Sequence, residues 1–264
     1  MTRLWKTYGR AILAVAEMTF RHNVMDAFII FTVLVQPLLI AVMAMWMLGD
    51  KGPEMAIFVV VGSGMTGLWS SLLFVSGNSI NVERRSGTLE TLVGVPTPLE
   101  VIVFGKNLAD VTQSLVSMVA SYLLAALLFG FDLSIQQPLL FVVSLLLAVV
   151  AFISFGLIIA PIFVMNPAVQ QFQNALEFPV YILSGFLFPI ALLPGWTTPL
   201  SYLLPPYWAA RALHATSSGT GALPEVLLCW GMMLLFSLVY FFLSSRLFKL
   251  MLVKARTDAT LDME

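Results

Sequence analysis

Long apolar stretches alternate with short polar connections along the chain, and their length predicts membrane-spanning helices. A helix needs about 20 mostly apolar residues to cross the hydrocarbon core of a bilayer. Stretches of that size predict six spans, at 27–48, 55–79, 106–130, 138–164, 168–189 and 223–246. Asn166-Pro167, a turn signal, separates the fourth span from the fifth. The predicted fold class is therefore an all-α integral membrane protein with six transmembrane helices.

Residues 190–221 are apolar but contain too many prolines for a further span. Proline removes a backbone donor and breaks a helix interior, so a broken re-entrant segment is predicted on the outer side of the membrane. The prolines that begin or lie within it are Pro189, Pro194, Pro199, Pro205 and Pro206. Its aromatic residues are expected at headgroup level, a role compatible with re-entry. They are Trp196, Tyr202, Tyr207 and Trp208.

Residues 1–26 predict an amphipathic helix at the membrane interface. Charged residues share one side of this helix: Arg3, Lys6, Arg10, Glu17 and Arg21. Apolar residues occupy the other: Trp5, Tyr8, Ile12, Val15 and Ala16. An interfacial helix is favoured over a solvated leader helix. A cleaved signal peptide is disfavoured because the apolar run that follows is long enough to span.

The composition excludes a soluble globular domain. Hydrophobic residues make up 59% of the chain and charged residues 10%, whereas soluble domains have about 45–50% and about 25%. The net charge of −1 argues against nucleic acid as a partner. The single Cys229 excludes an internal disulfide or a cysteine metal cluster. His22 and His214 lie near opposite faces, so no metal site is predicted.

The positions of the basic residues predict the orientation. Eleven of the 13 Lys and Arg residues fall before the first span, between the second and third, or after the last. Only Lys51 and Arg211 fall on the other side. The positive-inside rule then places both termini in the cytoplasm, in agreement with an even number of spans. The predicted location is the cytoplasmic (inner) membrane, with several passes and contact with its lipids.

A charged side chain inside a span costs roughly 2.5–3.5 kcal/mol on insertion. Ionisable and amide groups in the spans therefore need partners. The fifth span carries a polar stripe of Gln170, Gln173, Asn174, Glu177 and Tyr181. This stripe either lines a translocation path or forms interhelical contacts, and the sequence leaves both open. In the third span, Asp110 with Asn107 and Gln113 favours structural pairing.

Two backbone features are predicted inside the first two spans. Gln36-Pro37 predicts a kink in the first span, because proline frees a backbone carbonyl. Gly62, Gly64 and Gly67 predict a close approach of the second span to its neighbours.

The connection between the second and third spans predicts a short amphipathic helix over residues 81–93. Val82, Leu89 and Leu92 recur at helical spacing among charged residues. The connection is longer than the roughly 2–8 residues that a helix–helix turn needs, which argues against a simple connector. Pro96-Thr97-Pro98 predicts that one helix stops there and the next begins.

This segment carries a recognisable motif. Glu83-Arg84-Arg85-Ser86-Gly87-Thr88-Leu89-Glu90-Thr91-Leu92 closely resembles the E-R-E-x-G-T-L-E-x-L signature of type-2 ATP-binding-cassette (ABC) exporter permeases. Arg85 replaces the usual second acidic residue. The order of interfacial helix, six spans and broken outer segment before the last span is also similar to that family.

The resemblance implies that the motif forms a coupling helix seated in a groove of a cytoplasmic ABC ATPase subunit. The coupling residues would be Glu83, Arg84, Arg85, Gly87, Thr88, Leu89, Glu90 and Leu92. Leu89 and Leu92 are expected to be the apolar anchors, since no core at that depth is expected to bury them. Gly87 is expected at a bend or a close approach.

The resemblance further implies a subunit that works with an ATPase dimer and with a second permease, either another copy or a sister permease. The sequence contains no G-x-x-x-x-G-K-[ST] loop, so ATP and Mg are expected in the partner, with no cofactor in this chain. The expected function is export of a hydrophobic or amphiphilic substrate, such as a drug, a lipid or a lipid-linked glycan.

Two other classes fit the sequence less well. An integral-membrane, lipid-modifying enzyme would use Glu177 or Asp110, but no nucleophile, base and oxyanion donors converge with them, so no catalytic residue is predicted. An ion channel is disfavoured because no filter motif or charged pore run is visible.

Overall fold

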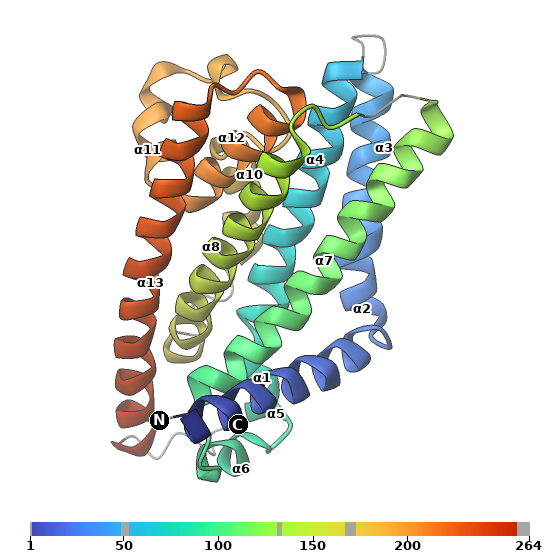
Figure 1. The fold of residues 1–264 in the computed structure, drawn as a ribbon. Coiled ribbons are helices and arrows are strands. Elements are labelled where there is room, and N and C mark those ends of the chain that lie inside the picture. Colours follow the sequence, from blue (N-terminus) through green and yellow to red (C-terminus); the bar gives the residue numbers. More distant parts are fainter. Residues whose placement is uncertain (1, 49–52, 131–133, 167–172, 258–264) are drawn as a thin grey trace.

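The computed structural model describes residues 2–48, 53–130, 134–166 and 173–257. All regular elements in these ranges are helices. Long helices stand roughly side by side, and α1 (Thr2–Asn23) lies across one end of the bundle (Figure 1). That end, here called the elbow end, also carries α5 (Ser79–Arg85), α6 (Leu89–Gly94) and the last turns of α13 (Leu223–Thr257). The opposite end carries α12 (Pro205–Ser218) and is called the α12 end.

The first predicted span is a helix interrupted by a π-helical turn. It consists of α2 (Ala27–Ile30), η1 (Phe31–Val35) and α3 (Gln36–Leu48). The π turn immediately precedes Gln36-Pro37, where the sequence predicts a disruption. Since Pro37 has no N–H and its ring crowds the preceding turn, the wider π turn accommodates it.

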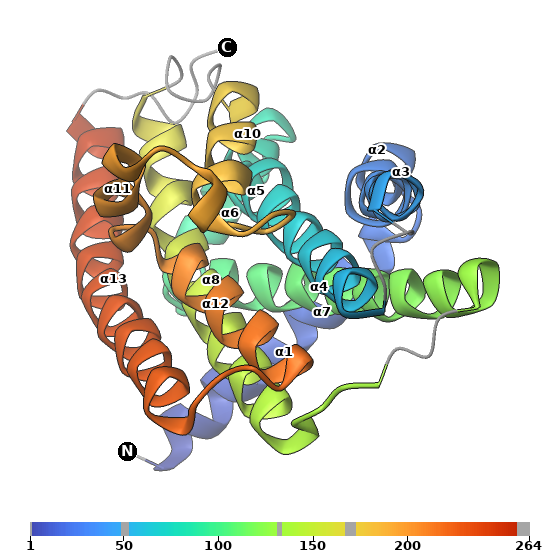
Figure 2. The same cartoon turned by 90° about the horizontal axis from the view of Figure 1, so that it is seen from above.

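The second span is the central helix of the bundle. It consists of α4 (Pro53–Ser70) followed by η3 (Ser71–Ser76), and α4 contacts α3, α7 (Leu99–Phe129) and α12 (Figure 2). A Cβ added to Gly62 would lie 1.8 Å from the Phe186 carbonyl oxygen. A Cβ on Gly64 would lie 2.4 Å from the Met118 side chain, and one on Gly67 would lie 3.0 Å from the Pro37 ring. The predicted close approach is confirmed at all three glycines.

Other helix boundaries differ from the predicted spans where charged residues extend a helix. Helix α8 (Pro138–Met165) matches its prediction closely. Helix α7 begins before residue 106, and α13 continues past residue 246 through Lys249 and Lys254. Hydropathy reports the thickness of the hydrocarbon layer, whereas backbone hydrogen bonds carry a helix on into water. Helix α7 ends where Gly130 adopts a left-handed φ of 66°.

The fifth predicted span is shorter than expected in the described residues. Helix α10 (Gln173–Leu183) ends at a turn in which Gly185 adopts a φ of 70°, before the predicted boundary at 189. Residues 167–172 lie outside the described residues. Five helical segments of the described chain are long and apolar enough to span a membrane, and α10 is not among them. The six-span topology stays a prediction.

Residues 190–221 form the broken segment that the prolines predict. It contains η4 (Ile190–Leu192), η5 (Gly195–Thr197), α11 (Thr198–Tyr202) and α12. Trp196 is 73% exposed, but Tyr207 and Trp208 are only 7% and 6% exposed. The expectation that these last two anchor at headgroup level is wrong. The Trp208 indole N–H donates to the Tyr202 carbonyl at 3.0 Å, so its polar atom is satisfied inside the fold.

Helix α1 packs on α7 through the apolar side that the sequence predicts. A Cβ on Gly105 would lie 2.9 Å from the Ile12 carbonyl oxygen and 3.0 Å from Val15 Cβ, so the two helices cross closely there. Arg10, Glu17 and Arg21 are exposed, and Arg21 pairs with Glu17 at 2.7 Å. The apolar side thus covers another helix of the chain.

We expect Gly62→Ala to destabilise the chain, because the added methyl group would meet backbone atoms that cannot rotate away. Overpacking of this kind typically costs about 1–3 kcal/mol. The measurement is the midpoint of thermal unfolding of the purified chain in detergent. Gly231→Ala is the matched control, since its Cβ would meet nothing within 4 Å. Equal midpoints for both variants would contradict the close approach.

Candidate coupling elbow and buried polar clusters

The motif between α4 and α7 forms a bent pair of short helices, here called the elbow and defined as residues 79–94. Helix α5 ends at Arg85, and α6 begins at Leu89. Between them Gly87 adopts a φ of 68°, a left-handed conformation that favours glycine. The single helix predicted over 81–93 is therefore wrong. Gly87 is the bend that the sequence allowed, with nothing within 4 Å of an added Cβ.

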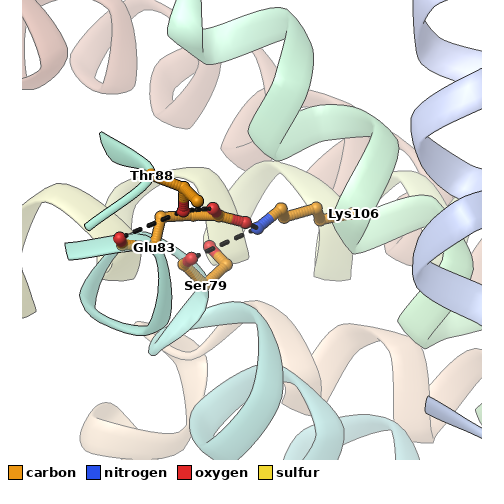
Figure 3. A network of polar contacts seen from close by, with 4 residues as sticks. All are labelled: Ser79, Glu83, Thr88 and Lys106. Carbon is orange, nitrogen blue, oxygen red and sulfur yellow. Dashed lines mark hydrogen bonds and ion pairs between the residues drawn. The ribbon is translucent and has the colours of Figure 1, made fainter. Parts of the chain in front are cut away.

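A polar network closes the elbow and ties it to α7 (Figure 3). Lys106 of α7 forms an ion pair with Glu83 and donates to the Ser79 carbonyl at 3.3 Å. The Thr88 hydroxyl also donates to the Glu83 carboxylate, and the Thr88 N–H donates to the Glu83 carbonyl at 3.0 Å. Glu83 and Thr88 of the motif thus shape the bend inside this chain.

Leu89 packs inside the chain, contrary to expectation. It is 5% exposed and belongs to a cluster at the elbow end. The other buried members are Ile80, Leu99, Val103, Leu157, Ala160, Phe248 and Met251. Leu92 is partly buried against the same cluster. The expectation that no core at this depth buries them is wrong, because α7, α8 and α13 all extend to this level.

The outward side of the elbow is formed by different residues. Val82 is 50% exposed, and Arg85, Ser86 and Thr91 are also exposed. Arg84 is half-buried, and the Glu90 side chain lies outside the described residues. Arg85 is the position at which the chain departs from the motif. The departure therefore changes the charge that the elbow presents outward.

Glu177 of α10 lies at the centre of a buried polar cluster. It is 4% exposed, and its Oε1 lies 2.7 Å from the Ser70 hydroxyl and 2.6 Å from the Tyr181 hydroxyl. The Gln36 amide donates to the same oxygen at 3.4 Å. The cluster thus joins the first, second and fifth predicted spans.

Gln173 extends this polar contact along α10. Its amide donates to the Leu73 carbonyl at 2.8 Å and accepts from Asn78 at 3.3 Å. Gln170 lies outside the described residues, as does the Asn174 side chain. The described polar side chains of α10 therefore face α4 and η3 within the chain, and this geometry favours interhelical contacts over an open lining.

Asp110 of α7 holds a second buried cluster. Its Oδ1 accepts from the Asn23 amide at 2.8 Å, and its Oδ2 accepts from the Ser76 hydroxyl at 2.7 Å. Asn107 donates to the Ile153 carbonyl at 3.4 Å. The structural role predicted for Asp110 is confirmed, but its partners are Asn23 and Ser76 and not Asn107 or Gln113. The contact joins the end of α1 to the last turn of η3.

The sequence did not identify the hydroxyl partners of these acids. Ser70 and Ser76 bond other helices, but Ser63 and Thr66 bond carbonyls of their own helix, Val60 at 2.9 Å and Ser63 at 2.7 Å. Serine and threonine in helices do either, so their presence in an apolar span does not distinguish the two roles. Nothing in the sequence pattern identifies Lys106 as the ion-pair partner of Glu83, because the two residues are distant in sequence.

We expect Glu177→Leu to lower the stability of the chain, because the Ser70 and Tyr181 hydroxyls would lose their shared acceptor, although they would keep the contact with each other at 2.5 Å. A hydrogen bond contributes about 0.5–1.5 kcal/mol net, so the loss of two costs about 1–3 kcal/mol. Glu177→Gln keeps one acceptor oxygen and should cost less. Thermal unfolding in detergent measures both, with the exposed Leu176→Met as a control. A Glu177→Leu variant as stable as the parent would show that the cluster contributes little.

Comparison with known proteins agrees with this architecture. The family described as ABC-2 type transporter matches residues 10–217, which include the larger part of α1, the elbow and all of α12 except its last residue. ABC transporter G family member 20 of Dictyostelium discoideum is 28% identical over 166 residues, which are 61% of this chain and 22% of the relative. The chain therefore spans less than a quarter of that relative's length. On the extent of the family match, the chain belongs to the ABC-2 type transporter family and is an ABC transporter permease.

Proposed function

We propose that this permease exports a hydrophobic or amphiphilic substrate across the cytoplasmic membrane, driven by ATP hydrolysis in a separate ATPase dimer. The observation that carries the proposal is the elbow, a rigid projection at the end of the central helix with an exposed outer side. ATP and Mg would be bound by the ATPase, and the elbow would receive its movement.

The charge distribution supports a cytoplasmic position for the elbow. Basic residues gather at the elbow end, on α1, the elbow, the start of α7 and the end of α13. They include Arg10, Arg21, Arg84, Arg85, Lys106, Arg246, Lys249 and Lys254. Arg211 lies on α12, at the other end. By the positive-inside rule the elbow end faces the cytoplasm, with both termini on that side.

The contacts of the elbow support a lever mechanism. Lys106 and Glu83 fix the elbow to α7, and Leu89 fixes it to α8 and α13. A force on the outer side would therefore move these helices together, as a packed body. Rigid-body movement of packed helices is a common way to alternate access across a membrane.

The outward side of α10 supports an apolar or amphiphilic substrate. Leu176, Phe178 and Ile182 are exposed there, while Glu177 and Tyr181 face inward. We place the second permease, another copy or a sister subunit, against this side, so that substrate passes along it. A drug, a lipid or a lipid-linked glycan all have the apolar portion that such a surface would contact.

We expect the double variant Val82→Asp, Arg85→Glu to weaken binding of the ATPase and to abolish transport. Both side chains are exposed in the chain, so folding should be retained. Loss of an interface anchor typically costs about 2 kcal/mol or more, a roughly thirtyfold loss of affinity. The measurements are ATPase retention on the purified permease and transport in vesicles. Leu89→Ala would not serve this test, because it would damage the core of the chain.

Arg246→Glu is the matched control, because Arg246 is an exposed arginine at the same end but outside the elbow. It should retain the ATPase and transport at parental levels. If the double variant also retains both, the elbow is not the docking surface. If the control loses them equally, a general change of charge at this end explains the effect.

A further inference from the structure

Residues of α12 and its neighbours line a cavity of about 340 Å³. Helix α12 lies at the end of the bundle opposite the elbow (Figure 1). Its walls come from α12, the start of α4, the start of α13 and the turn that follows α10. Small-molecule sites typically begin at about 300 Å³, so the cavity has room for a polar group of a ligand. Phe58, Pro189 and Ile190 supply apolar wall, and Ser184, Arg211 and His214 supply polar wall.

Buried polar atoms of this cavity have no partner within the described part of the chain. They are both ring nitrogens of His214 and the hydroxyl of Ser184. The His214 ring is held in place by stacking on Phe58, with ring centres 3.7 Å apart and planes 10° apart. These atoms are closed off from the open space of the cavity, so the His214 ring is a fixed part of the wall behind the charged groups.

The charged groups of the cavity are only loosely engaged with each other. Arg211 lies 3.9 Å from Glu225, at the outer limit of an ion pair, and 3.4 Å from the Tyr207 hydroxyl. Both charged side chains are partly exposed. A guanidinium in this arrangement can take a stronger, charge-assisted contact with a ligand oxyanion.

The charge balance of the cavity favours a ligand with both signs of charge. Burial lowers the pKa of His214 to about 4, and the nearby backbone of Phe186 and Gly185 opposes this only in part. His214 is therefore neutral at pH 7, so that Arg211 and Glu225 supply one charge of each sign. A purely anionic ligand would meet the Glu225 carboxylate without compensation.

We propose that this cavity binds a phosphoethanolamine group, with its phosphate on Arg211 and its ammonium on Glu225. The guanidinium matches the oxygens of a phosphate, and the carboxylate matches an ammonium. Phe58 and Ile190 would contact the carbon portion of the ligand. The same group occurs in a zwitterionic lipid of the outer leaflet and in a soluble phosphodiester, and the experiment separates these two sources.

The test uses the full purified chain in detergent, without nucleotide or ATPase. Three probes are titrated by calorimetry: dihexanoyl phosphatidylethanolamine, dihexanoyl phosphatidylglycerol and glycerophosphoethanolamine. We expect the ethanolamine lipid to bind at least about tenfold tighter than the glycerol lipid, because only the former has an ammonium for Glu225. Tighter binding of the lipid than of glycerophosphoethanolamine assigns the source to the membrane, and equal binding assigns it to a soluble ligand. The two assignments both support the site.

Variants locate the binding. Arg211→Gln should weaken the ethanolamine lipid about tenfold or more, because it removes a charge-assisted contact. Glu225→Gln should remove the preference for ethanolamine over glycerol. Ala215→Leu should fill the cavity without removing a polar group. Arg246→Gln, at the elbow end, should bind like the parent.

The proposal is overturned if the parent binds both lipids equally or binds none of the three probes. It is also overturned if Arg211→Gln keeps parental affinity for the ethanolamine lipid, whether or not Ala215→Leu folds. Because no step of this test needs ATP hydrolysis or transport, its failure would leave the coupling proposal standing, and the reverse also holds.

Discussion

The close packing of α4 is the constraint on which the rest of the structure depends. Without side chains at Gly62, Gly64 and Gly67, this helix approaches the turn after α10, α7 and the first span at once. In a membrane there is little hydrophobic drive between helices, so close packing and interhelical hydrogen bonds supply the association. The helix that packs most closely also continues through η3 into the elbow. Movement of the elbow is thereby joined to the centre of the bundle.

Polar contacts follow one another along this second span and fix it to its neighbours. Ser70 meets Glu177 of α10, Ser76 meets Asp110 of α7, and Glu83 meets Lys106 of α7. The hydrocarbon layer offers no water to satisfy such groups, so each must find its partner in the protein. The acids that first suggested a path or an acid–base role are thus engaged in holding helices together. Asp110 also brings in α1 through Asn23, so the helix across the elbow end is part of the same assembly.

The motif of the elbow has an internal explanation as well as a partner-facing one. Glu83, Gly87, Thr88 and Leu89 build the bend and fix it to the bundle. The residues that face outward, Val82 and Arg85 among them, are the less restricted positions. This division separates the residues that hold the shape of the elbow from those that the proposed ATPase contact would use. The substitution of Arg85 for an acidic residue falls in the second group, which is why the elbow keeps its shape despite it.

The sequence by itself determined the class of fold, the helix that crosses the elbow end, the bounds of three spans to within a few residues, and the broken outer segment. These follow from hydropathy and proline, which act locally or through the thickness of the bilayer. It also predicted the close approach of α4, and it marked Gly87 as either a bend or a close approach, between which only the structure decided. Only the tertiary structure decided which side of the elbow is outward, because Leu89 is covered by α8 and α13, helices that lie far along the chain. The same reason applies to Tyr207 and Trp208, whose burial depends on the helices that surround α12. Glu177 and Asp110 accept hydrogen bonds from hydroxyl groups that lie 107 and 34 residues away in the sequence. A periodic pattern describes one element and carries no information about contacts between elements, so the sequence did not identify these partners.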